Sequence, residues 1–207
     1  MRQEGVVEWA QTLLTIGFIR YLRRGDYIEK SDISLGDRNV EVYKFCQGNG
    51  PPAQKTLWDT IIWDKSSLES ITVEEQELVL EHELSHRDRN PVYKGIFIGA
   101  LLMLAPGLFI LLYSPLHLLN GAPLTELVDS VVAGFSIVAG FVLIWRIEEM
   151  WADYDAICAL GEDKFMTAYR RFKTGSDASM AHKILEKVVY TKPENTRRLY
   201  RRLHQSD

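Results

Sequence analysis

Cysteine is scarce in this chain, because only two of its 207 residues are cysteine, Cys46 and Cys158. Two cysteines do not make the disulfide framework of a small secreted scaffold, and a cytoplasmic placement predicts both thiols reduced. Internal repeats and low-complexity tracts are also missing, and the length indicates one unit rather than two domains. The net charge of −4 and the pI near 5.8 argue against a nucleic-acid partner.

Lysine and arginine are missing from residues 95–145, although the chain has 24 of them elsewhere. Residues 95–113 form an uncharged, mostly apolar run of 19 residues. Such a run is about 28 Å long as a helix, close to the roughly 30 Å of a bilayer core. Residues 130–145 are a shorter uncharged run that needs flanking residues to complete a crossing. The sequence therefore predicts a transmembrane helical hairpin over residues 95–147, with a buried hairpin in a soluble core as the alternative.

Positive charges flank this hairpin but are absent from its loop. Arg87, Arg89 and Lys94 precede the first run and Arg146 follows the second, whereas residues 114–129 carry turn signals and no basic residue. The positive-inside rule then places both flanks in the cytoplasm and the loop outside. We therefore expect an integral protein of the plasma (inner) membrane with two spans.

The segment 1–25 is predicted to form an amphipathic helix that lies on the membrane surface. An interfacial helix combines an apolar face that includes Trp or Phe with a polar side. A third span is the alternative, although residues 6–19 are short for a crossing and contain Glu8. The polar residues that recur at helical spacing are Glu4, Glu8, Gln11, Thr12 and Thr15.

The pentapeptide His82-Glu83-Leu84-Ser85-His86 carries the strongest chemical signal in the chain. Residues one helical turn apart differ by only about 40° around the axis, so both histidines can bind one metal ion. Glu83 then projects beside the ion toward a bound water.

The context of this motif favours a helix. Residues 73–86 contain no Gly or Pro and place apolar side chains at helical spacing, and either Ser70 or Thr72 can cap the helix. A chance match to a short pattern is the alternative, and the helical context argues against it.

Glu149 supplies the third protein ligand that a catalytic zinc needs. Asp153 follows it by one helical turn, so one helix can bring a carboxylate to the ion and another to the outer ring nitrogen of a ligand histidine. The fourth position stays open for water. The sequence thus predicts one zinc ion per chain, bound by His82, His86 and Glu149.

The order of a strand, this helix, an apolar hairpin and a later helix resembles the HtpX and CAAX-prenyl-protease group of integral-membrane gluzincin metallopeptidases. The resemblance covers residues 57–205. It implies an α+β, mainly α fold in which residues 26–94 and 148–207 form a zincin-like (minigluzincin) catalytic domain with a small sheet around the inserted hairpin. It also implies that Arg146 and Asp153 support the metal ligands. The matching positions are His82, Glu83, His86, Arg146, Glu149 and Asp153.

Other family positions match less closely. Residues 60–64 resemble the edge strand of the family, so Ile62 is expected to help hold an extended substrate added to the sheet. Lys192 stands where the family commonly has a histidine. Lys192, Tyr190 and Arg198 are therefore candidates to replace that residue in the transition state.

Together these features predict a membrane-embedded zinc endopeptidase in which Glu83 takes a proton from the attacking water and passes it to the leaving amine. Its substrates are expected to be membrane or membrane-proximal polypeptides. A regulatory protease resembling the BlaR/MecR antirepressor type is one alternative, although those receptors carry a large external sensor. A non-enzymatic membrane scaffold is the other, although a structural zinc normally has four protein ligands.

Overall fold

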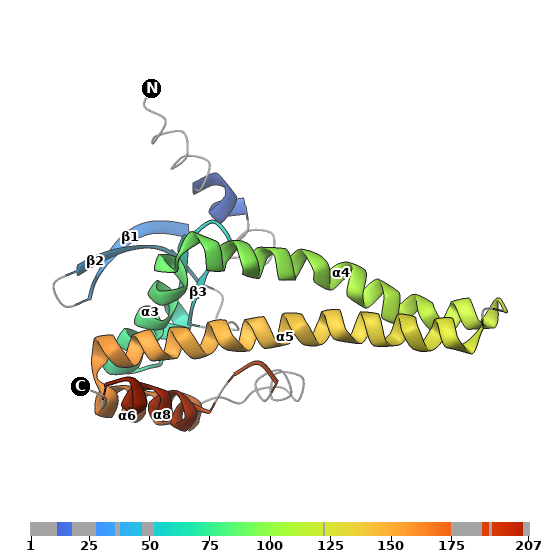
Figure 1. Cartoon of the computed structure of the whole chain (residues 1–207). Coiled ribbons are helices and arrows are strands. Elements are labelled where there is room, and N and C mark those ends of the chain that lie inside the picture. The colour runs from blue at the N-terminus through green and yellow to red at the C-terminus, as the bar shows by residue number, and fades with distance from the viewer. Residues whose placement is uncertain are drawn as a thin grey trace. The chain divides into compact units, whose positions relative to one another are not determined.

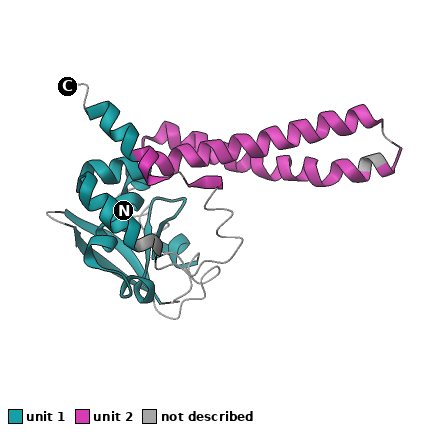
Figure 2. Ribbon diagram, turned by 90° about the horizontal axis from the view of Figure 1, so that it is seen from below, with its two compact units in different colours: residues 1–88, 152–177, 197–207 teal, residues 89–151, 178–196 magenta. Residues whose placement is uncertain are grey.

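The computed structural model shows a mainly helical chain with one small mixed sheet and two long apolar helices (Figure 1). This confirms the expected class, α+β and mainly α. The chain divides into two compact units, which Figure 2 shows in different colours. Unit 1 comprises residues 1–88, 152–177 and 197–207, and unit 2 comprises residues 89–151 and 178–196. The structure describes residues 12–17, 28–35, 38–46, 52–121, 123–174, 188–190 and 192–204.

Unit 1 contains a four-stranded sheet with the order β1-β2-β4-β3. Its strands are β1 (Ile28–Leu35), β2 (Arg38–Phe45), β3 (Ala53–Lys55) and β4 (Ile61–Asp64). β1 pairs antiparallel with β2, β2 parallel with β4, and β3 antiparallel with β4. All residues of β4 are buried, as expected for a strand with a neighbour on each side.

The expectation that residues 60–64 form an edge strand is wrong. β4 lies inside the sheet, because the short strand β3 pairs with it on the side away from β2. Ile62 pairs with Tyr43 on one side and Gln54 on the other, and its side chain is only 1% exposed. Ile62 therefore has no open backbone edge to offer a substrate. Within the described residues, the open edge on this side of the sheet belongs to β3.

The helix α3 (Val73–Asp88) begins at a capping box. The Oγ1 of Thr72 accepts the N–H of Glu75 at 3.3 Å, and Oε2 of Glu75 accepts the N–H of Thr72 at 2.6 Å. The helix predicted over residues 73–86 is confirmed, and its cap is Thr72 rather than Ser70.

Both apolar and charged contacts fix α3 against the sheet. Leu80 is 1% exposed and packs in one cluster with Val42 of β2, which is completely buried. Glu81 is also buried and forms an ion pair with Arg38 of β2. Burial raises the pKa of the Glu81 carboxyl in spite of this cation. Residues that precede His82 on α3 thus fix the position of the helix on the sheet.

Three further helices belong wholly or mostly to unit 1, namely α2 (Lys65–Leu68), α6 (Glu162–Thr174) and α8 (Pro193–His204). Glu162 at the start of α6 accepts hydrogen bonds from the guanidinium groups of Arg201 and Arg197 on α8. These hydrogen bonds, that of Arg201 first, lower the pKa of Glu162 to about 2. The carboxylate therefore stays ionised and holds α8 on α6 at neutral pH.

Residues 12–17 form a short helical segment of unit 1. Thr15 is completely buried and accepts a hydrogen bond from the indole N–H of Trp58 at 2.6 Å. Leu13 and Leu14 are exposed, with 48% and 54% of their surface accessible. Most of the predicted interfacial helix lies outside the described residues, so its membrane role stays a prediction.

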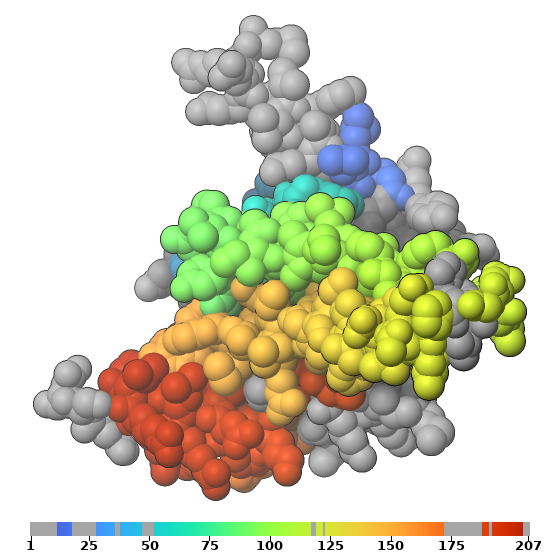
Figure 3. Space-filling model, turned by 45° about the vertical axis from the view of Figure 1, so that its right-hand side comes forward, coloured from blue at the N-terminus to red at the C-terminus, as the bar shows by residue number. Residues whose placement is uncertain are grey.

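Unit 2 contains α4 (Pro91–Leu119) and most of α5 (Leu124–Leu160), which lie side by side in Figures 1 and 3. Both helices are long and apolar enough to cross a bilayer. Only 6% and 11% of their most apolar stretches are buried, whereas the core helix of a soluble protein is buried on most sides. This exposure disfavours the soluble-core alternative. α5 also continues past residue 147 without a break, so one helix carries both the second apolar run and Glu149.

Glycines allow the two apolar helices to approach closely. A Cβ atom added at Gly134 of α5 would lie 2.9 Å from the carbonyl oxygen of Gly107 on α4 and 2.8 Å from Cγ of Leu111. One added at Gly107 would lie 2.7 Å from Cγ2 of Ile137. Small residues let helices pack at short distance where burial from water gives little driving force.

Replacing Gly134 is expected to loosen this contact. In Gly134→Leu the new side chain meets backbone that cannot move aside alone, so the variant should lose about 1–3 kcal/mol of stability and melt earlier in detergent. Gly140→Leu is the matched control on the same helix, because nothing lies within 4 Å of a Cβ added there. Thermal unfolding followed by circular dichroism measures both variants. Equal midpoints for Gly134→Leu and Gly140→Leu would contradict the close contact.

Candidate metal centre

α3 presents two imidazoles to one point in space. The Nε2 atoms of His82 and His86 lie 3.3 Å apart, and the two rings meet edge to face with centroids 4.9 Å apart. Two like nitrogens at this distance do not both carry a proton without repulsion. At least one of these nitrogens therefore directs a lone pair toward the other.

Asp153 on α5 settles which nitrogen of His82 is protonated. Its Oδ1 lies 3.0 Å from Nδ1 of His82, and Asp153 is only 5% exposed. A carboxylate accepts the N–H of Nδ1, which leaves Nε2 of the neutral ring with its lone pair toward His86. Both residues belong to unit 1, so this arrangement is internal to it. The structure thus brings Asp153 to one of the two candidate ligand histidines.

Glu149 lies one turn before Asp153 on α5, which is a single continuous helix. It is 7% exposed, and its Oε1 accepts a hydrogen bond from the indole N–H of Trp145 at 2.9 Å. The ligand atoms that His82, His86 and Glu149 offer all lie within 4.8 Å of one another. Among the described residues, this is the group of histidine, cysteine and acidic side chains that can hold a metal ion.

The donor atoms of this group fit zinc. In a tetrahedral site with Zn–N distances of about 2.0–2.1 Å, two ligand nitrogens lie about 3.3 Å apart. The separation of the two Nε2 atoms is 3.3 Å. Two neutral imidazoles and one carboxylate are a common ligand set for catalytic zinc, and they leave a fourth position for water. The carboxylate on His82 adds the outer support that zinc-bound histidines usually have.

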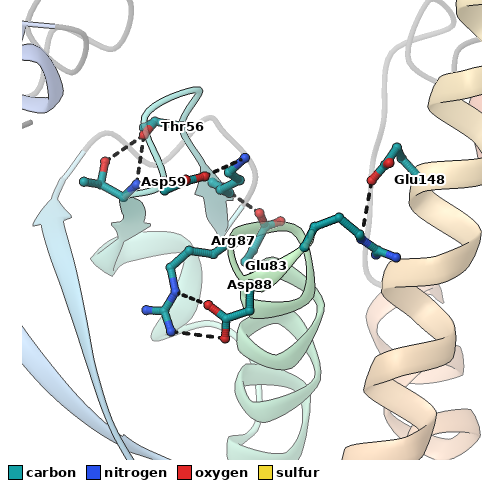
Figure 4. A network of polar contacts seen from close by, with 9 residues as sticks. Thr56, Asp59, Glu83, Arg87, Asp88 and Glu148 are labelled. Carbon is teal, nitrogen blue, oxygen red and sulfur yellow. Dashed lines mark hydrogen bonds and ion pairs between the residues drawn. The ribbon is translucent and has the colours of Figure 1, made fainter. Parts of the chain in front are cut away.

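The side chain of Glu83 points from α3 toward strand β3. Its Oε2 accepts the backbone N–H of Lys55 at 2.6 Å, and Figure 4 shows the carboxylate directed at the turn that follows β3. Nζ of Lys55, the last residue of β3, lies 3.0 Å from Oδ1 of Asp59 in that turn. The φ of Asp59 is 65°, which is unusual for a residue other than glycine. The N–H of Thr56 donates to the carbonyl oxygen of Thr60 at 2.8 Å. The turn therefore has a defined shape, and its β3 end meets Glu83.

Several of these contacts had not been expected from the sequence. The amide of Lys55 is a backbone group, so no residue type signals it. Trp145 precedes Glu149 by one helical turn, and this spacing is visible in the sequence. A hydrogen bond from Ser85 to Asp155 also links α3 to the end of α5. In unit 2, Arg89 forms an ion pair with Glu148 at 3.6 Å (Figure 4).

The remaining predicted site residues lie on the surface. Arg146 is exposed on α5. Tyr190 and Lys192 are exposed in unit 2, and Arg198 is exposed on α8 in unit 1. The roles expected for these four residues stay predictions.

Comparisons of the chain with protein-family models, with curated proteins and with solved structures found no match.

Asp153 and Asp155 offer a matched test of the support behind His82. Asp153→Asn should weaken zinc binding by about 10- to 100-fold, because an amide no longer holds the ring as a carboxylate does. Asp155→Asn changes a carboxylate two residues away that accepts the hydroxyl of Ser85; an amide oxygen can still accept that hydroxyl, so zinc affinity should stay near that of the wild type. Competition with a chelating dye measures both. Equal affinities for the two variants would show that Asp153 does not support the metal centre.

Proposed function

We propose that this chain is a membrane-embedded, zinc-dependent endopeptidase with a zincin-like catalytic domain, similar to the HtpX and CAAX-prenyl-protease group. The observation that carries the proposal is the convergence of His82, His86 and Glu149 within 4.8 Å. Asp153 behind His82 and Glu83 on the same helix complete the set of groups that peptide hydrolysis requires. The proposed ligand content is one zinc ion per chain.

The chemistry divides between the ion and Glu83. When bound, zinc polarises the scissile carbonyl and lowers the pKa of a coordinated water to about 7. Glu83 is the base that takes a proton from the attacking water and delivers it to the departing amine nitrogen. The N–H of Lys55 holds Oε2 of Glu83 at 2.6 Å, which orients the carboxylate for this transfer.

The open edge of β3 is the proposed binding place for an extended polypeptide. The N–H of Thr56 donates to the carbonyl oxygen of Thr60, and the N–H of Asp64 donates to the carbonyl oxygen of Pro52. These two hydrogen bonds define which backbone groups of β3 face β4. The N–H of Lys55 faces away from β4 and toward Glu83. The N–H of Lys55 is taken by Glu83, so a peptide that pairs with the remaining part of this edge runs beside the catalytic base, a role that the sequence had suggested for β4.

The bilayer is the second proposed partner. α4 and α5 expose large apolar side chains such as Leu102, Leu112 and Phe135, which are 66–75% accessible. The absence of lysine and arginine from residues 95–145, against their presence on both flanks, favours cytoplasmic ends for both helices. A catalytic site on the cytoplasmic face and membrane or membrane-proximal polypeptide substrates follow from this orientation.

Glu83→Gln separates chemistry from metal binding. The amide cannot take a proton from water, so cleavage of a denatured reporter protein should fall by at least about 100-fold, while the zinc content stays at about one ion per chain. Glu74→Gln is the control, because Glu74 is an exposed glutamate in the first turn of the same helix.

Two results would contradict the mechanism. Wild-type cleavage rates in Glu83→Gln would show that Glu83 is not the base. Zinc bound by a wild-type protein that cleaves no membrane or denatured substrate would favour the non-enzymatic scaffold.

Cysteine labelling tests the proposed topology. In a background with Cys46→Ser and Cys158→Ser, the variant Asn120→Cys should react with an impermeant thiol reagent added to intact cells, because Asn120 lies in the turn between α4 and α5. Glu69→Cys in unit 1 should react only after lysis, since Glu69 is exposed on the proposed cytoplasmic side. Labelling of both positions in intact cells would mean that the hairpin does not cross the bilayer.

A further inference from the structure

We propose that Trp145 is a positioning residue for the zinc ligand Glu149, and that the packing of α4 on α5 acts on zinc affinity through its indole ring. This inference rests on the metal site of the proposed function. It concerns residues 97–149 of unit 2 alone.

A hydrogen bond connects Trp145 to the Glu149 carboxylate. Trp145 lies one turn before Glu149 on α5, and its indole N–H donates to Oε1 at 2.9 Å. Glu149 is only 7% exposed, so bulk water does little to orient its carboxylate. The hydrogen bond from Trp145 restrains the position of Oε1. Buried carboxylates that ligate metals commonly depend on such a partner for orientation.

The donor in this hydrogen bond is an uncharged indole. An indole N–H is a donor only and carries no charge. It can fix Oε1 without neutralising the carboxylate, and a metal cation needs that negative charge. A guanidinium in the same place would compete with the metal cation for that charge. The choice of tryptophan therefore suits a carboxylate that serves a metal ion.

Aromatic side chains support the indole ring of Trp145. The indole of Trp145 packs on Phe141 with centroids 5.6 Å apart, and Phe141 is 6% exposed. Phe141 in turn packs on Phe97 of α4 with centroids 6.0 Å apart. The rotamer of Trp145 is thus set by a row of aromatic contacts that crosses from α4 to α5. A change in the packing of these helices moves the donor, and through it Glu149.

The test measures zinc and cobalt(II) binding by the full chain in detergent. Trp145→Phe keeps an aromatic ring and removes the N–H, so zinc should bind about 10- to 100-fold more weakly. The absorption bands of bound cobalt(II), which report ligand geometry, should also change. Trp151→Phe is the control on the same helix, because Trp151 is 37% exposed, and it should match the wild type in both measurements.

Phe97→Leu provides a second arm that leaves Glu149 and its donor in place. Zinc affinity should fall several-fold, although Phe97 lies on the other helix. Wild-type affinity in Trp145→Phe, or in Phe97→Leu where Trp145→Phe does not fold, would overturn the inference. A wild-type chain that binds no zinc would overturn the proposed metal site as well, and the titration of the wild type shows this before any variant is compared.

Discussion

The hydrogen bond between His82 and Asp153 is the interaction on which the candidate site depends. It joins α3 to α5 across 71 residues of sequence, within unit 1. It fixes the tautomer of His82, and so it decides that Nε2 rather than Nδ1 is offered to a metal ion. On the continuous helix α5, Glu149 lies one turn before Asp153. A second bond, from Ser85 to Asp155, holds the two helices at a neighbouring turn.

Each of the three carboxylates of the candidate site accepts a hydrogen bond from a donor without a fixed positive charge. Glu83 accepts a backbone amide, Glu149 an indole N–H, and Asp153 an imidazole. Neutral donors orient a carboxylate but leave its charge in place. Elsewhere in unit 1 the carboxylates of Glu81 and Glu162 are instead paired with arginine. These three donors leave the carboxylate charge available to a divalent cation, whereas the arginines that pair with Glu81 and Glu162 neutralise theirs.

Structural features that depend on local sequence were predicted well, whereas features that depend on tertiary pairing were not. The helix of His82 and its cap follow from spacing and from Thr72 next to Glu75, and both are local. The apolar helices follow from charge and length. β3 has only three residues and no hydrophobic alternation, so its pairing with β4 had no sequence signal. The amide of Lys55 becomes a partner of Glu83 only through that pairing. The contact of Trp145 with Glu149, by contrast, could have been predicted from helical spacing alone.

The continuity of α5 has a mechanical consequence for the proposed enzyme. Trp145 ends the uncharged run and Glu149 lies four residues later, which is about 6 Å along a helix axis. Residues 141–160 contain no glycine or proline, so the helix has no hinge between its apolar part and the ligand. Glu149, the proposed metal ligand, is consequently held at a fixed height above the end of the apolar run. In the proposed enzyme a substrate must reach that height, which favours the proposal that its substrates are polypeptides in or next to a bilayer.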